Sequence, residues 1–128
     1  LEKFGLILTL EALISNVNES LLIQLIVNHD YQKRPISFEV QIYRIIQEFL
    51  SNVIKHAKAS NMLIHIRDTE TSLALILSDN GVGFDNSILK KGMGLKNIDS
   101  RIKSINAFSK WKSKKGNGSR LIIILPIQ

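Results

Sequence analysis

Four polar residues follow one another at helical spacing: Glu48, Asn52, Lys55 and His56. At 100° per residue these positions form one strip along a helix, so their side chains can face a single cleft. A carboxylate and an amide oxygen one turn apart suit Mg²⁺, which prefers oxygen ligands and shares its coordination with substrate phosphates. The strip therefore indicates a site for a magnesium-bound phosphate compound, with Lys55 and His56 meeting phosphate oxygens. An amphipathic helix with a solvated polar edge would show the same spacing.

A second candidate is an acid at the end of an apolar strand, Asp79, which is followed by Gly81 and Gly83. Glycines allow the main chain to pass close to a flat group, and a buried carboxylate can accept a hydrogen bond from an exocyclic amino group. Adenine fits both requirements. A two-residue hairpin turn at Gly81 is the alternative, but the glycines continue through Gly92 and Gly94, beyond any such turn.

A third candidate is the segment Gly92, Met93, Gly94 and Leu95, where a loop gives way to a helical pattern. Free main-chain N–H groups and the positive end of a helix favour binding of an anion, and a triphosphate is the ligand that we expect here. A plain junction of loop and helix has the same pattern, and residues 116–119 read equally as a turn.

Helices and strands that would position these residues follow from hydrophobic periodicity. An apolar stripe that includes Val53 and Ile54 marks a helix from the Pro35 region to Ala57, with one face in the core. The other expected elements are helices at 1–17 and 95–105, a hairpin of strands 62–67 and 73–77, and strands at 21–27, 108–113 and 121–127. This order predicts an α+β fold: a two-layer sandwich with three helices on one face of a mixed sheet of about five strands.

Composition narrows the class of protein without choosing a function. The chain has no cysteine, which excludes disulfides and thiolate metal sites and favours a cytoplasmic domain. Its longest apolar run, Leu121 to Leu125, is far too short to span a bilayer. Residues 81–128 carry ten basic and two acidic side chains, so this half favours an anion: a nucleotide, a nucleic acid or an acidic partner. A solvated basic surface would look the same.

The order and spacing of these motifs resemble the catalytic domain of sensor histidine kinases, in the superfamily that includes DNA gyrase, the ninety-kilodalton heat-shock chaperones and MutL-type repair proteins. Residues 43–57 look like the asparagine box of its nitrate-sensor and DesK-like branch. Residues 79–84 look like the first glycine box, residues 92–101 like the second, and residues 116–119 like the companion of the second. The resemblance covers nearly the whole chain from about Leu21 and implies the ATP-binding Bergerat fold.

The resemblance implies a role for each matching residue. Asn52 would ligate Mg²⁺, and Glu48 would hold the water shell of the metal or polarise the reacting groups. Asp79 would accept from the adenine amino group, while the remaining matches would shape the base pocket or contact phosphate: Lys55, His56, Gly81, Gly83, Gly92, Met93, Gly94, Leu95 and Ser119. The implied cofactors are ATP and Mg²⁺.

Two departures from the family pattern bear on the local structure and on the reaction. Asn106 and Ala107 stand where the family ends a helix with asparagine and glycine, so Asn106 is expected in the left-handed conformation. None of His29, His56 and His65 has the helical context of a phosphoacceptor. The resemblance places that histidine on an upstream dimerisation hairpin, of which residues 1–17 would be the trailing helix or a linker, and residues 18–128 would be the catalytic domain.

The expected function is transfer of the γ-phosphoryl group of Mg·ATP to that upstream histidine, for relay to a response-regulator aspartate. The parent protein is expected to be a homodimer, and because the sequence begins at Leu1, an upstream part could include membrane spans. Rival interpretations are a serine-phosphorylating anti-sigma kinase or an ATP-hydrolysing clamp of the same fold. A basic nucleic-acid-binding module is less favoured, since aromatic residues are only 6% of the chain and do not alternate with the lysines. We therefore expect no nucleic-acid partner.

Overall fold

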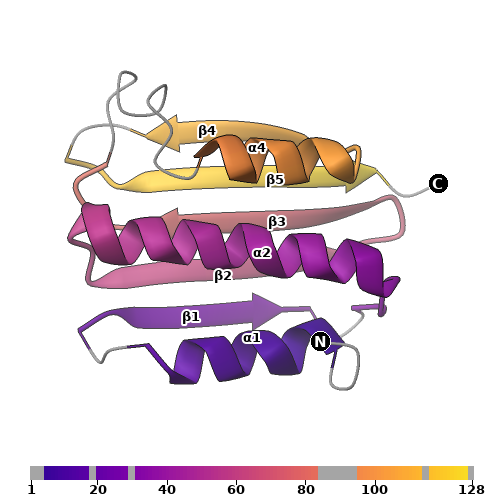
Figure 1. Ribbon diagram of the computed structural model, residues 1–128, viewed down its shortest axis with the longest axis horizontal. Coiled ribbons are helices and arrows are strands. Elements are labelled where there is room, and N and C mark those ends of the chain that lie inside the picture. Colours follow the sequence, from indigo (N-terminus) through magenta and orange to yellow (C-terminus); the bar gives the residue numbers. More distant parts are fainter. Residues whose placement is uncertain (1–4, 18–19, 29–30, 84–94, 114–115, 127–128) are drawn as a thin grey trace.

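The fold is described by a computed structural model that covers residues 5–17, 20–28, 31–83, 95–113 and 116–126. Its elements are α1 (Gly5–Ser15), β1 (Leu22–Val27), α2 (Ile36–Asn52), the π-helix η1 (Val53–Ala57), β2 (Asn61–Asp68), β3 (Ser72–Asp79), α4 (Leu95–Ser104), β4 (Phe108–Ser113) and β5 (Ser119–Pro126). The strand order is β1-β2-β3-β5-β4, with β1 parallel to β2 and the other neighbouring pairs antiparallel. Helices α1, α2 and α4 lie on one face of the sheet (Figure 1), which confirms the predicted two-layer α+β fold.

The core lies between this helical layer and the sheet. Alternate residues of β2 and β3 are buried on the helical side, as period-two strands with one covered face require. Across the layer, the ring of Phe49 in α2 stacks on that of Trp111 in β4, with centroids 6.0 Å apart. Leu6 and Leu10 of α1 are fully buried in the same core, so α1 packs as part of this domain. That residues 1–17 also belong to an upstream hairpin stays a prediction.

The last turn of the central helix differs from the prediction. Residues 53–57 form a π-helical turn, in which main-chain bonds run from i to i+5 and rotate the following side chains relative to an α-helix. Val53 stays buried, but Ile54, predicted on the core stripe, is 58% exposed. The turn ends at Lys58 in the left-handed conformation, φ 51°. Asn106 also has positive φ, 57°, which confirms the left-handed residue predicted after α4.

A buried polar network fixes the start of α2. The Glu39 side chain is fully buried and accepts hydrogen bonds from the Tyr31 hydroxyl at 2.6 Å and the Arg34 amide at 3.2 Å. Arg34 also forms a 2.7 Å ion pair with the buried carboxylate of Asp68 at the end of β2. Burial, together with the bond to Glu39 and its charge, raises the pKa of the Tyr31 hydroxyl. This network joins the β1–α2 connection to the sheet.

None of the helices in the described ranges is long and apolar enough to cross a lipid bilayer.

Candidate functional site

Asp79, the last residue of β3, has an oxygen atom available for a ligand. Its side chain lies on the helical side of the sheet and is 9% exposed. One carboxylate oxygen, Oδ1, accepts a 2.7 Å hydrogen bond from the Gly81 amide. The other, Oδ2, is fully buried and has no hydrogen-bond partner in the part of the chain that the structure describes. An unpaired buried acceptor costs about 1–3 kcal/mol, a cost that a donor from a bound molecule would remove.

Burial also sets the charge of Asp79. Removal from water raises the pKa of its carboxyl group, and the main-chain amides of Gly81 and Ser119 offset part of that rise. A carboxyl oxygen can accept from an exocyclic amino group.

The turn between β4 and β5 packs against the segment that follows Asp79. Gly118 has a φ of 76°, and a Cβ atom added there would overlap the main-chain carbonyl oxygen of Asp79. Beside it, the Gly116 amide donates to the carbonyl of Val82 at 2.5 Å. Only a glycine at 118 allows this approach, so the 116–119 segment and the first glycine segment form one wall.

Ser119 completes that wall at the start of β5. It lies opposite Asp79 in the antiparallel register of β3 and β5 and is 3% exposed. Its hydroxyl oxygen is 3.0 Å from that of Ser113. The pairing of β3 with β5 therefore brings Ser119, which was predicted to bind the nucleotide, opposite Asp79.

Asn80, which was not among the predicted site residues, bonds to the chain at the start of β2. Its Oδ1 accepts from the amides of Ser60 and Asn61, both at 2.9 Å, and its Nδ2 donates to the Ser60 hydroxyl at 2.9 Å. These bonds tie the end of β3 to the connection between η1 and β2. The available signal was an amide residue next to a glycine, since asparagine often bonds main-chain groups at turns.

Glu48 and Asn52, the predicted metal ligands, lie four residues apart on α2. Glu48 is half-buried, and Asn52 is 8% exposed at the end of the helix. Figure 1 shows that α2 ends at the same end of the domain as β3, so Asn52 and Asp79 approach that end from the two layers. Within the described ranges, no group of three or more His, Cys, Asp or Glu residues could hold a metal alone.

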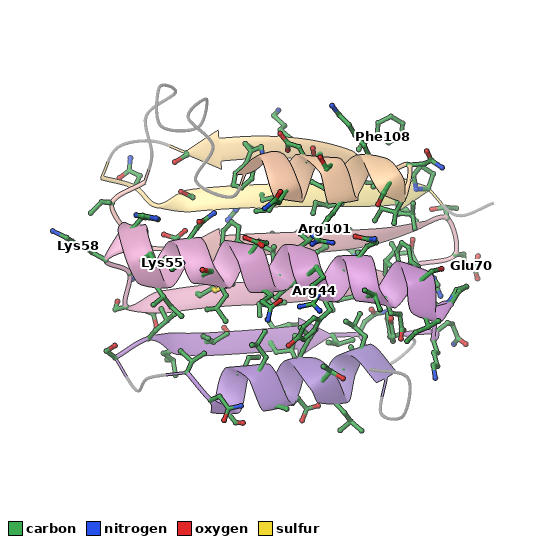
Figure 2. All side chains as sticks on the ribbon, viewed as in Figure 1. Arg44, Lys55, Lys58, Glu70, Arg101 and Phe108 are labelled. Atoms are coloured by element: carbon green, nitrogen blue, oxygen red, sulfur yellow. The ribbon has the colours of Figure 1, made fainter. Side chains whose placement is uncertain are left out.

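Lys55 and His56 are both exposed in the π-helical turn. Figure 2 shows Lys55 and Lys58 at this end of the domain, far from Glu70 at the other end. Lys55 lines an apolar groove of about 330 Å³ between α1 and the end of α2, together with Leu13 and Ile54. No hydrogen bond or ion pair of the described residues joins Lys55 or His56 to Asp79, and their contact with phosphate stays a prediction.

The remaining predicted site residues lie on the glycine segments. Gly81 and Gly83 follow Asp79 closely and are buried. Gly83 has a φ of 71°, a conformation that glycine adopts without the steric strain that a side chain would cause. Gly92, Met93 and Gly94 lie outside the described residues. Leu95 is the first residue of α4, as predicted for the start of this helix.

Comparison with known families agrees with this fold. Residues 38–128 match the family described as histidine kinase-, DNA gyrase B- and HSP90-like ATPases. Among solved structures, the histidine kinase domain of a blue-light activated histidine kinase from Erythrobacter litoralis EL346 superposes with a TM-score of 0.76 at 17% identity, over 95% of this chain and 61% of that one. The catalytic domain of the histidine kinase ThkA superposes with a TM-score of 0.70 at 14% identity, over 94% of this chain and 86% of that one.

Relatives with known names are sensor kinases. The signal transduction histidine-protein kinase/phosphatase DegS of Brevibacillus brevis is 32% identical over 130 residues, which cover 99% of this chain and 34% of that protein. The sensor histidine kinase YdfH of Bacillus subtilis is 41% identical over 90 residues, 67% of this chain and 22% of that protein. The chain thus spans about a third or less of the length of these relatives.

Because the match covers more than half of the chain, the chain belongs to the family of histidine kinase-, DNA gyrase B- and HSP90-like ATPases, and its helical layer over a mixed sheet agrees with that family. Within that family, the named relatives that it matches, DegS and YdfH among them, are histidine kinases. The predicted family is confirmed, and its relatives do not favour the anti-sigma, clamp or nucleic-acid interpretations.

Proposed function

We propose that this domain binds Mg·ATP and transfers the γ-phosphoryl group to a histidine on an upstream helical hairpin, from which it passes to an aspartate of a response regulator. The observation that carries the proposal is the buried, unpaired Oδ2 of Asp79, an acceptor that the adenine amino group would satisfy. The relatives named histidine-protein kinases support the choice of reaction. A homodimeric parent protein and the upstream hairpin belong to the same proposal.

Asn52 and Glu48 fit a magnesium ion that arrives with the nucleotide. They offer an amide oxygen and a carboxylate one turn apart, which is too few ligands for a protein-only site but suits an ion that shares its coordination with phosphates. When bound, Mg²⁺ neutralises charge on the phosphate oxygens. Asn52 would hold the ion, and Glu48 would orient its water or the reacting groups.

The residues of this chain would mainly position the nucleotide. Phosphoryl transfer needs little covalent help, so catalysis consists of alignment and charge stabilisation. Asp79 would fix the base, Gly81 and Gly83 would let the main chain approach it, and Ser119 would complete that wall. Phosphate contacts are assigned to Lys55, His56 and the main chain of residues 92–95.

Titration calorimetry of ATP, with and without Mg²⁺, tests the nucleotide part of the proposal. We expect Asp79→Ala to weaken ATP binding at least about tenfold, because the variant loses the acceptor for the amino group. Asn52→Ala should instead abolish the difference between titrations with and without Mg²⁺. Unchanged ATP affinity in Asp79→Ala would refute the assignment of the base pocket.

The transfer step has a separate test. The chain is joined to the upstream hairpin of the parent protein, or mixed with it, and incubated with γ-labelled ATP. We expect acid-labile label on a hairpin histidine, absent in the Asn52→Ala variant. Acid-stable label on serine would favour the anti-sigma type of kinase, and release of phosphate without protein labelling would favour a simple ATPase.

A further inference from the structure

The face of the sheet that points away from the helices has an unusual composition. Strands β3 and β5 contain unbroken apolar runs, Leu73–Leu77 and Leu121–Leu125. Such runs are typical of strands that are buried on both faces, whereas a strand with one solvent-exposed face alternates apolar and polar residues. Here α1, α2 and α4 all cover the same face (Figure 1). The outward half of each run therefore lacks a covering layer among the described residues.

Exposure values locate an apolar patch on this outward face. Phe108 of β4 is 69% exposed and lies opposite Ile124 of β5, which is 42% exposed. Next to them, the half-buried Ile76 and Ile122 lie opposite each other in the register of β3 and β5. Figure 2 shows Phe108 near the end of the sheet opposite Lys58. Contiguous apolar surface of this kind marks an interaction site.

Charge on the outward face has a single sign. Its basic residues are Arg67, Lys110, Lys112 and Arg120, and none of the outward residues of the described strands is acidic. Lys112 and Arg120 lie directly opposite each other in the β4–β5 register, an arrangement that destabilises a sheet. No ion pair of the described residues neutralises them. A partner with carboxylates would relieve this repulsion.

We propose that the outward face docks an acidic amphipathic helix of a partner protein. The apolar stripe of that helix would lie on the Ile76, Ile122 and Ile124 side chains, and its carboxylates would pair with Lys110, Lys112 and Arg120. A helix on this side would give the sheet the second helical layer that its apolar strands lack. Strands of eight residues span about 26 Å, which matches a helix of about 17 residues.

Two other occupants are disfavoured, a second copy by charge and a membrane by the short reach of the apolar side chains. A second copy in a symmetric face-to-face dimer would bring the same cations against one another, because an isologous interface pairs one patch with itself. An anionic membrane would need apolar side chains that reach beyond the headgroups. Ile76 and Ile122 are half-buried between neighbouring strands, and Phe108 is the one aromatic residue among the outward positions described.

The proposal can be tested with a synthetic helix of 17 or so residues that carries a leucine stripe flanked by glutamates, and with the same peptide carrying lysines instead. We expect the 128-residue chain to bind the glutamate peptide, with NMR shift changes on outward residues of β3, β4 and β5. Lys110→Glu combined with Lys112→Glu should weaken this binding about tenfold or more, as should Phe108→Ser with Ile124→Ser. The matched controls are Lys103→Glu and Leu8→Ser, exposed residues of the helical layer, and these should leave binding unchanged.

Each other result overturns the proposal. The proposal is wrong if the glutamate peptide does not bind at millimolar concentration, if the lysine peptide binds equally well, or if the NMR shift changes are confined to the helical layer. Sedimentation that shows a dimer lost in Phe108→Ser would assign the face to a second copy. Tighter binding to vesicles of phosphatidylglycerol than to the peptide would assign it to a membrane. ATP affinity is measured on the same variants. If it is unchanged, the loss of peptide binding does not come from damage to the nucleotide site.

Discussion

Gly118 lies directly against the main-chain carbonyl of Asp79, so that a side chain at 118 and the observed end of β3 exclude each other. One residue reads the base in the proposed site, and the other sits in a turn nearly forty positions later. Their contact joins β5 to the glycine segment after β3. The shape of the nucleotide pocket thus depends on a residue that need not touch the nucleotide.

Replacing this glycine should damage the pocket. We expect Gly118→Ala to lower the free energy of unfolding and to weaken ATP binding, because the new Cβ overlaps the Asp79 carbonyl in addition to the cost of positive φ. Gly116→Ala is the matched control: its φ is 88°, but a Cβ there would meet no atom within 4 Å. That variant should lose about 1–2 kcal/mol of stability and keep its ATP affinity. Urea unfolding measures the stability of each variant, and calorimetry measures its ATP affinity. Equal losses in the two variants would contradict the importance of the contact between Gly118 and the Asp79 carbonyl.

The raised pKa of the Asp79 carboxyl gives stability a pH dependence. Since the folded state binds this proton more tightly than the unfolded state, the free energy of unfolding should fall as the pH rises from the ordinary range of aspartate through the raised pKa. Asp79→Asn, which cannot ionise, should remove this part of the fall and should also weaken ATP binding. Urea unfolding at a series of pH values measures it. Parallel curves for the two proteins would show that Asp79 does not titrate in this way.

The Arg34–Asp68 ion pair should be costly to break. Its two side chains are 18% and 5% exposed, so Arg34→Met leaves a buried carboxylate without its cation. We expect a loss of about 3–5 kcal/mol in the free energy of unfolding. Arg44→Met removes an exposed arginine that donates to Gln47 and lies 5.9 Å from the centroid of the Tyr43 ring, and it should cost no more than about 1 kcal/mol. Chemical denaturation of the two variants compares them directly.

Asn80 should act through its two acceptor bonds. Asn80→Ala frees the amides of Ser60 and Asn61 and should cost about 1–2 kcal/mol, whereas Asn80→Asp keeps the acceptor and should lose less. If the bonds position Asp79, the alanine variant will also bind ATP more weakly, and the aspartate variant will restore most of that affinity. An alanine variant with normal ATP affinity would limit Asn80 to a stabilising role.

Periodicity and turn residues were sufficient to predict most of the fold. The β2–β3 hairpin, the amphipathic stripe of α2 and the β4–β5 hairpin each depend on local pattern, and local pattern is what a sequence displays. The local part of the candidate site could be predicted in the same way, because Asp79 and the glycines near it form compact motifs. The pairing of β3 with β5, which brings Ser119 opposite Asp79, was not predicted, because it joins segments about forty residues apart.

Features set by tertiary packing could not be predicted. The π-helical turn that exposes Ile54 has no local signature, since its residues would also continue an α-helix. Glu39 was missed, although a carboxylate three residues before Ile42 on the apolar stripe was a signal of a buried polar network. The burial of Leu6 and Leu10 of α1 depends on contacts with α2 that its own sequence does not specify.

The single parallel pairing has a consequence for how the domain opens. β1 is held by β2 alone at one margin of the sheet, and its partner Asn61 lies thirty-nine positions beyond Leu22. The hydrogen bonds between β1 and β2 can therefore break while the hydrogen bonds between the interior strands β3 and β5 stay formed. Amide protons of β1 should exchange with solvent through such partial openings, ahead of those beside Asp79. The edge of the sheet at β1 should thus open separately from the strands that carry Asp79 and Ser119.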